Sequence, residues 1–301
     1  MAGVRPSPKV YQLSVRLNQD HGGAVAPVVV DHDGLKNSGA RHVLMFVHGY
    51  NNSAAEARTS YALQMNCLKT LQNRNNAPDA IAHFQWPGDL PGPFIGTDWS
   101  RYADDIPQAI EAAARLAIFV ADLPRPNGDA RALKLSFIGH SMGCRLILEA
   151  LYRLSDSKLP KLEVASFMAA AAGVPLVAAN GRLRTKTRDA RAVLKFFSEW
   201  DVVLRLGFPL GQLLAYQRGI EPENYSEAIG LHGNPSDFGA PNQTTNGHSK
   251  YWGDEAVANI FMANIDPALR QLPDPRALAD RDLSPPNDMP EREILTRDLP
   301  T

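Results

Sequence analysis

A serine at position 141 stands between two glycines in the stretch Gly139-His140-Ser141-Met142-Gly143. An apolar run ending at Ile138 precedes this stretch, and a long helix-forming run follows it. The order predicts a strand, a sharp turn and a helix, because the two glycines let the strand and helix backbones approach closely. Such a turn presents the Ser141 hydroxyl as a nucleophile and points the first helical amides at the group it attacks. The alternative is a glycine-flanked surface serine, so the interpretation depends on partners elsewhere in the chain.

A serine nucleophile needs a base, and that base needs an acid to orient it. In a parallel sheet these groups are expected in the loops that follow strands, where ligands bind. The expected strand at 192–197 is followed by Ser198-Glu199-Trp200-Asp201. We predict Asp201 as the acid because it begins the following turn, with Glu199, still at the strand end, as the alternative. An N-cap role for Asp201 on the helix expected at 201–216 is the competing interpretation, and both roles can coexist.

The order serine, acid, histidine requires a base that lies after Asp201. Two histidines satisfy that order, His232 and His248. His248 lies in a loop directly before the last expected helix, beside a glycine and several aromatic residues, so we predict it as the base. His232 lies at the end of an expected strand and is interpreted as structural. His140, inside the turn, is expected to pack or form hydrogen bonds locally.

The strand expected at 42–47 ends in His48-Gly49-Tyr50. Gly49 permits a tight turn that would let the Tyr50 amide face Ser141, and with the Met142 amide it would form a two-donor oxyanion hole. A plain strand-ending turn is the alternative interpretation. Tyr50, Trp86 and Trp252 are candidates to line an acyl pocket, although aromatic side chains in loops often fill the core instead.

Apolar runs and helical periodicities alternate along most of the chain, which predicts an α/β fold with a mostly parallel sheet and helices on both faces. An opening antiparallel hairpin is expected at 9–17 and 25–30. Further strands are expected at 42–47, 80–86, 133–138, 164–172, 192–197 and 226–231. Helices are expected at 54–71, from Asp104 to about 120, after Ser141, at 201–216, at 255–265 and partly at 177–190. The long segment between Asp201 and His248 leaves room for a small lid.

The chain has 301 residues, is 44% hydrophobic and carries a formal net charge of −1. A net charge this close to zero gives no reason to expect nucleic acid as a partner. The sequence also lacks an apolar run long enough to span a bilayer and an N-terminal signal sequence, so a cytoplasmic protein without membrane insertion is expected. Residues 1–265 are expected to form one domain, and the Pro- and charge-rich residues 266–301 a tail or surface arm. No metal or cofactor is expected.

Five segments together resemble the α/β-hydrolase superfamily of serine esterases and lipases. They are residues 48–53, 84–87, 137–143, 198–201 and 247–249, which include His48-Gly49-Tyr50-Asn51 and the Gly-His-Ser-Met-Gly turn. More narrowly they resemble a bacterial branch catalogued as a domain of unknown function. The resemblance covers roughly residues 40–262. It implies a Ser141–His248–Asp201 triad, an oxyanion hole from Tyr50 and Met142, and no cofactor.

The sequence therefore predicts a serine hydrolase that cleaves small carboxylic esters through an acyl-enzyme. One alternative is a catalytically silent α/β-hydrolase scaffold that binds a partner. Another is an acyltransferase or thioesterase that uses the same triad. The physiological substrate, the acyl-chain preference and the oligomeric state are not encoded in any pattern that we can interpret.

Overall fold

The computed structural model describes residues 7–17, 24–30, 33–68, 77–89, 99–124, 133–156, 162–170, 174, 193–233 and 240–265. The arm expected at 266–301 and the helix expected at 177–190 lie outside these residues. The described strands form one eight-stranded sheet with the order β2-β1-β4-β3-β5-β6-β7-β8. Their bounds are β1 (Lys9–Arg16), β2 (Val25–Val30), β3 (His42–Val47), β4 (Ala80–Gln85), β5 (Leu133–His140), β6 (Leu162–Ala170), β7 (Val193–Phe197) and β8 (Ala240–Gln243).

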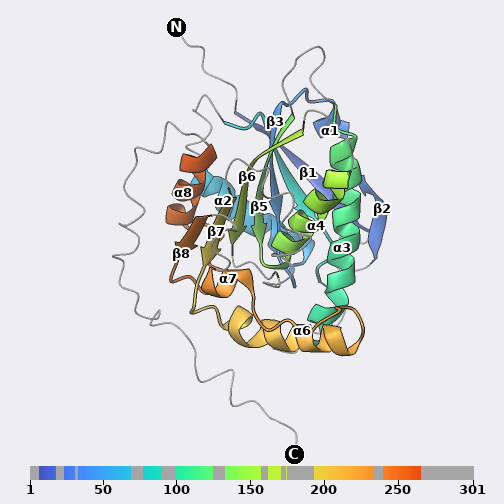
Figure 1. Cartoon of the computed structure of the whole chain (residues 1–301). Coiled ribbons are helices and arrows are strands. Elements are labelled where there is room, and N and C mark those ends of the chain that lie inside the picture. The colour runs from blue at the N-terminus through green and yellow to red at the C-terminus, as the bar shows by residue number, and fades with distance from the viewer. Residues whose placement is uncertain are drawn as a thin grey trace, which may run out of the picture.

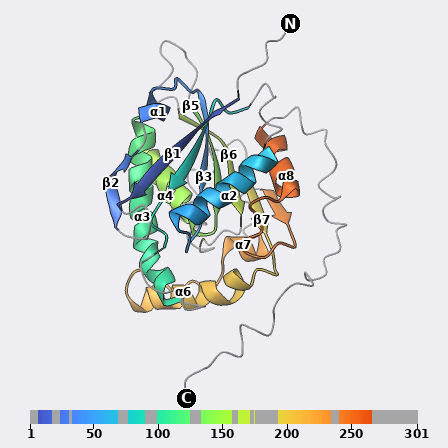
Figure 2. The same cartoon turned by 180° about the vertical axis from the view of Figure 1, so that it is seen from behind.

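The sheet is parallel except at one edge, where β1 and β2 form the expected antiparallel hairpin. The helical segments are α1 (Asp33–Lys36), α2 (Ala54–Cys67), α3 (Trp99–Ala121), α4 (Met142–Asp156), the π-helix η4 (Val203–Gly207), α6 (Phe208–Gln217), α7 (Ile229–His232) and α8 (Glu255–Ile265). Helices α3 and α4 cover one face of the sheet (Figure 1). Helices α2 and α8 cover the other face (Figure 2). The predicted α/β architecture is therefore confirmed.

The central strands are buried on both faces, as their uninterrupted apolar sequences predict. Val43 to Val47 of β3 and Leu135 to Ile138 of β5 have almost no exposed surface. Helix α3 buries a stripe of alanines, including Ala109 and Ala113, which lets it pack closely on the sheet and on α4. These layers fix the carboxyl ends of β3, β5 and β7 relative to one another, and the candidate site lies at those ends.

Three expected elements differ from the structure. The strand expected at 226–231 is instead α7, whose last turn ends at Gly233 in the left-handed conformation (φ 66°). Strand β8 forms in a segment where no strand is expected, because pairing with β7 overrides the weak strand propensity of Ala-Pro-Asn-Gln. Helix α3 begins at Trp99 rather than near Asp104 and continues through Pro107, which places Asp105 inside the helix.

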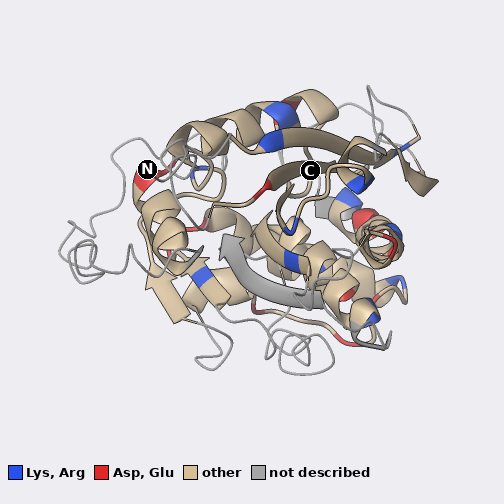
Figure 3. Ribbon diagram, turned by 90° about the horizontal axis from the view of Figure 1, so that it is seen from above, with Lys and Arg blue, Asp and Glu red and all other residues tan. Residues whose placement is uncertain are grey.

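Acidic and basic positions are interspersed around the described ribbon (Figure 3). This distribution agrees with the near-zero net charge of the sequence. Within the described ranges, every helix is too short or too polar to cross a bilayer.

Candidate active site

Ser141 occupies the turn between β5 and α4 and has a positive φ of 51°. A left-handed backbone is uncommon outside glycine and asparagine, so this strain marks a position that its surroundings hold in place. The Ser141 carbonyl accepts a hydrogen bond from the Cys144 amide at 3.0 Å, which starts the helix directly behind the serine. The predicted strand–turn–helix unit is therefore present.

The glycines on either side of Ser141 are required by close backbone approaches. A Cβ atom on Gly139 would lie 2.7 Å from the Ile147 side chain and 3.1 Å from Cys144 Cα. A Cβ atom on Gly143 would collide with the His48 carbonyl oxygen and lie 2.6 Å from that of Val47. Only glycine thus lets the first turn of α4 pack against the end of β3. This packing brings the helix start beside the loop that follows β3.

Ser141, His248 and Asp201 lie in one continuous chain of hydrogen bonds. His248 Nε2 is 2.9 Å from Ser141 Oγ, and His248 Nδ1 is 2.8 Å from Asp201 Oδ2. A carboxylate only accepts, so the Nδ1–H donates to Asp201 and Nε2 accepts the serine proton; this tautomer is assigned from the partners. Asp201 is fully buried, and its other oxygen accepts the Leu204 amide at 3.0 Å. The carboxylate therefore orients the histidine and caps the start of the following helical segment at once.

The two sequence alternatives, Glu199 as the acid and His232 as the base, lie outside this hydrogen-bonded chain. Glu199 is exposed in the turn before Asp201, and His232 is exposed at the end of α7. His248 itself is only partly buried, with its side chain 17% exposed.

His140, the residue before the serine, also contacts the loop that carries His248. Its Nε2 donates to the His248 backbone carbonyl at 2.6 Å. Burial lowers the pKa of His140 to about 3, and the nearby His248 adds to this effect, so the ring is neutral near pH 7. A Cβ atom on Gly49 would lie 2.8 Å from His140 Nδ1 and 2.9 Å from Ser141 Cβ. Gly49 is thus the point where the loop after β3 approaches Ser141.

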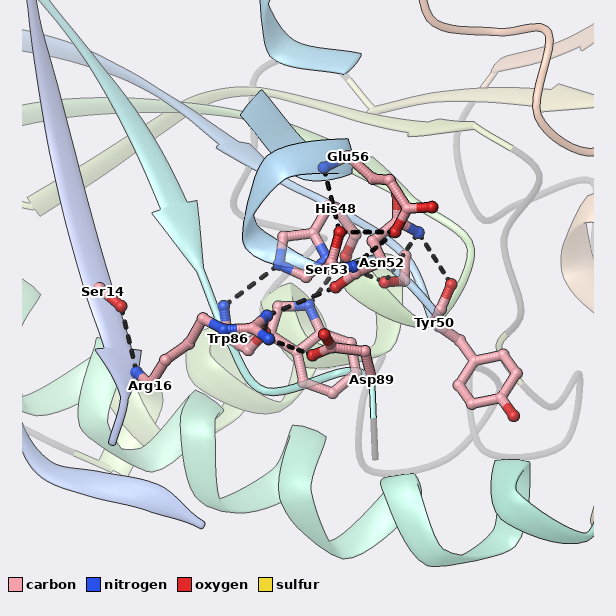
Figure 4. A network of polar contacts seen from close by, with 10 residues as sticks. Ser14, Arg16, His48, Tyr50, Asn52, Ser53, Glu56, Trp86 and Asp89 are labelled. Atoms are coloured by element: carbon pink, nitrogen blue, oxygen red, sulfur yellow. Dashed lines mark hydrogen bonds and ion pairs between the residues drawn. The ribbon is translucent and has the colours of Figure 1, made fainter. Parts of the chain in front are cut away.

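We call residues 48–53 the oxyanion loop, after the role that the sequence predicts for the Tyr50 amide. His48 is fully buried at its start, and its Nδ1 donates to the Gly49 carbonyl at 2.9 Å. Its Nε2 accepts the Trp86 amide at 3.2 Å, and its own carbonyl accepts the Trp86 indole N–H at 2.9 Å. Burial lowers the pKa of His48 to about 3, which keeps Nε2 unprotonated and able to accept. Figure 4 shows this ring between the loop and Trp86.

The Gly49 carbonyl and the Tyr50 N–H belong to one peptide unit. In a trans peptide the two groups point in opposite directions, so the hydrogen bond from His48 to the carbonyl sets the direction of the Tyr50 N–H. Asn52 Nδ2 adds a 2.8 Å hydrogen bond to the Tyr50 carbonyl. Asn51 has a positive φ of 56°, and its amide donates to the Gly88 carbonyl at 2.6 Å. The backbone around Tyr50 is therefore held on several sides.

The three aromatic residues predicted to line a pocket have different surroundings. Trp86 is fully buried and stacks on the His48 ring at 5.5 Å, which suits support of the oxyanion loop better than contact with substrate. Trp252 is 9% exposed and its ring lies 5.9 Å from that of His140. Tyr50 is partly exposed; its ring points away from the polar network (Figure 4) and meets Tyr102 edge-on at 5.6 Å.

Sequence reasoning missed a charged group that contacts the oxyanion loop. Arg16, at the end of β1, is 2% exposed and forms an ion pair with Asp89. Asp105 of α3 is fully buried, and within the described part of the chain neither of its carboxyl oxygens has a hydrogen-bond partner. Burial, with Asp89 and Asp104 nearby, raises the pKa of Asp105 to about 8. For Arg16 the one signal in the sequence is its position at the end of an alternating strand, and this position predicts no particular partner.

A scan against family models gives one match: residues 29–211 fit the model described as "alpha/beta hydrolase of unknown function (DUF900)". These residues include the β3 loop, the Ser141 turn and Asp201, and they make up more than half of the chain. The chain belongs to this family of alpha/beta hydrolases. The fold expectation is thereby confirmed, together with the coarse assignment to hydrolases. His248 lies beyond the matched segment, so its place in the site depends on the structure.

Among the solved structures to which the chain is similar is a lipase-esterase related protein from Clostridium acetobutylicum. It is 11% identical, with a TM-score of 0.39 over 75% of this chain and 95% of that one. A hyperthermophilic esterase from the archaeon Pyrobaculum calidifontis is 15% identical, with a TM-score of 0.40 over 80% of this chain and 78% of its own. A search of curated proteins finds no match. Likenesses this distant say nothing about the substrate of this hydrolase family member.

Within the described residues, no group of three or more histidines, cysteines and carboxylates is arranged to hold a metal ion.

Proposed function

We propose that this alpha/beta hydrolase cleaves carboxylic esters of small molecules through an acyl-enzyme on Ser141. The observation that carries the proposal is the hydrogen-bonded chain from Ser141 Oγ through both nitrogens of His248 to the buried carboxylate of Asp201. Each contact lies within the distance at which a proton can be transferred or held. The order of these residues along the chain is that of alpha/beta hydrolases.

In the proposed reaction, Ser141 Oγ attacks the ester carbonyl carbon while His248 Nε2 takes the serine proton. Asp201 stabilises the imidazolium that forms and keeps Nδ1 protonated throughout. The carbonyl oxygen becomes an oxyanion, which we assign to the amides of Tyr50 and Met142. His248 then returns the proton to the leaving alcohol, and the acyl group stays on Ser141. Water, deprotonated by the same imidazole, releases the acid and regenerates the serine.

The electrostatics around the site support this cycle. Asp201 is fully buried, so its interaction with the imidazolium is weakly screened by solvent. His140 and His48 are both neutral near pH 7 because burial lowers the pKa of each to about 3. Neither ring therefore carries a positive charge that would oppose the one that His248 acquires.

Labelling with a fluorophosphonate tests the proposal directly, because the reagent reacts preferentially with activated serines. We expect one adduct per chain on Ser141 and turnover of p-nitrophenyl acetate. Ser141→Ala should lose the adduct and about six orders of magnitude of turnover, with unchanged thermal unfolding. His248→Ala should lose similar activity. An unlabelled but folded wild-type protein would instead support the silent scaffold.

A chain-length series from acetate to octanoate would then define the acyl preference. Thioesters offered in parallel, and alcohols or amines added to the ester reaction, separate hydrolysis from acyl transfer. Water as the dominant acceptor supports the hydrolase. A product distribution that follows the added nucleophile would favour the acyltransferase, and faster thioester turnover would favour the thioesterase.

A further inference from the structure

We propose that Arg16 is a positioning residue that holds the oxyanion loop in its catalytic shape. The inference rests on the proposed function in that it assigns the Tyr50 amide to the oxyanion. Arg16 itself would touch neither substrate nor the reacting atoms. It lies at the end of β1, beside the oxyanion loop and the segment that carries Trp86 and Asp89 (Figure 4).

The guanidinium of Arg16 contacts two separate loops. Its Nη1 donates to the Trp86 carbonyl at 2.8 Å and lies 3.4 Å from the Asn52 carbonyl. Its Nη2 pairs with the Asp89 carboxylate. The group therefore joins the oxyanion loop to the segment 86–89, which we call the strap. A planar fork of fixed donors can bind acceptors in these different directions, and a lysine ammonium cannot reproduce that geometry.

A short series of hydrogen bonds connects the strap to the Tyr50 amide. Arg16 fixes the Trp86 carbonyl, and the Trp86 N–H donates to His48 Nε2. The His48 Nδ1–H then holds the Gly49 carbonyl, whose peptide unit carries the Tyr50 N–H. The strap also accepts from the loop directly, through the Asn51 amide and the Gly88 carbonyl at 2.6 Å. If the strap were displaced, the direction of the Tyr50 N–H, the proposed oxyanion donor, would therefore change.

The positive charge of Arg16 also supports the hydrogen bond between Trp86 and His48. Burial is the main reason that the pKa of His48 is low, and Arg16 lowers this pKa further, which helps to keep Nε2 as an acceptor for the Trp86 amide. Its own burial is compensated by Asp89, whose side chain is 13% exposed. A buried arginine that bridges two loop carbonyls and a carboxylate has more contacts than the neutralisation of Asp89 requires. Those additional contacts are with the two segments that shape the loop.

Two variants test the role without leaving an isolated buried charge. Arg16→Lys retains a cation for Asp89 but loses the two-loop bridge. The double variant Arg16→Met with Asp89→Asn removes both charges and keeps the apolar stem. Arg145→Lys is the matched control, because the Arg145 guanidinium on α4 also forms a buried ion pair, and its partner Glu221 belongs to neither the oxyanion loop nor the strap.

The first measurement is hydrogen–deuterium exchange of the whole protein, followed by peptide mass spectrometry. In both Arg16 variants we expect faster exchange in peptides that cover residues 48–53 and 86–89, and unchanged exchange around Asp201. The Arg145 control should retain the wild-type pattern in those loop peptides. Equal exchange of the loop in Arg16→Lys and wild type would overturn the proposal. This measurement does not depend on catalysis, so it tests the positioning role even if the protein proves not to be an esterase.

The second measurement separates positioning from general destabilisation. If the Tyr50 amide is misdirected, kcat for p-nitrophenyl acetate should fall by about tenfold to a hundredfold with KM unchanged, since an oxyanion donor acts mainly in the transition state. Affinity for a phenylboronic acid, which forms a tetrahedral adduct with the serine, should fall in parallel. A rise in KM at constant kcat, or an equal loss of kcat in Arg145→Lys, would contradict the proposal.

Discussion

His140 Nε2 donates to the backbone carbonyl of His248 at 2.6 Å, so the residue beside the candidate nucleophile also anchors the candidate base. A carbonyl can only accept, which places the proton of the neutral His140 ring on Nε2 and leaves Nδ1 as an acceptor. Within the described part of the chain Nδ1 has no hydrogen-bond partner. The β5–α4 turn therefore sets the distance between serine and imidazole through a side chain as well as through the backbone.

Removing this donor should weaken the alignment of His248. We expect His140→Leu to lower kcat by about tenfold or more, since a small misplacement of a catalytic group is costly. His140→Gln, whose amide N–H can replace the ring donor, should recover much of the loss. The measurement is steady-state hydrolysis of p-nitrophenyl acetate with thermal unfolding of each variant alongside. Equal activity of the Leu and Gln variants would show that the hydrogen bond has no catalytic role.

The sequence is sufficient to predict the parallel sheet, the Ser141 turn and the residues found in one hydrogen-bonded chain. The sheet, the turn and Asp201 depend on local patterns: uninterrupted apolar runs, glycines at fixed offsets, and a polar residue directly after a strand. His248 follows from the order serine, acid, histidine along the chain. His140 can be placed at the turn from its neighbours, but its bond to His248 cannot, because the partner lies 108 positions away. The catalytic roles themselves remain predictions that the proposed labelling and kinetic experiments address.

Arg16 and Asp105 show why the rest is hidden from the sequence. A lone arginine at a strand end gives no information about which carbonyl groups will surround it, since those come from loops after two other strands. The sequence around Asp105 predicts a helix start, because acidic residues and a proline such as Pro107 are typical of a first turn. Helix α3 instead begins at Trp99, so Asp105 faces the core. Tertiary packing decides both cases.

Because Gly143 lies so close to the end of β3, adding a single methyl group at this position should lower the stability of the protein. In Gly143→Ala the new Cβ would meet two backbone carbonyl oxygens, which cannot rotate away as a side chain can. We expect a loss of about 1–3 kcal/mol in the free energy of unfolding, as in other overpacked cores. Urea denaturation measures it. Gly247→Ala is the control, because its Cβ would meet no atom within 4 Å; equal losses at both sites would contradict the assignment.

Histidines with a lowered pKa predict a loss of stability in acid. Burial lowers the pKa of His140 to about 3 and that of His42 to about 4, so each binds fewer protons when folded than when unfolded. Their contribution is complete above pH 6.5 and falls as the pH drops toward the folded pKa, by about 1.4 kcal/mol per unit for each group. The free energy of unfolding, measured with urea at several pH values between 7 and 4.5, should change less steeply with pH in His42→Gln than in wild type. An identical slope would mean that His42 titrates normally in the folded protein.

The buried carboxyl group of Asp105 predicts that the stability of the fold decreases as the pH rises. Its pKa is raised to about 8 in the folded protein, so the folded state retains a proton that the unfolded state loses near pH 4. The stability that this group contributes is therefore complete below about pH 4 and decreases by about 1.4 kcal/mol per pH unit until pH 8.

Asp105→Asn resembles the protonated form. Its free energy of unfolding should match that of wild type in acid but exceed it at pH 8. Glu111→Gln, in an exposed pair with Arg115 on the same helix, is the control and should produce no such divergence. The difference between variant and wild type isolates the carboxyl from the histidines, and a difference that is constant with pH would show that Asp105 is ionised in the folded protein.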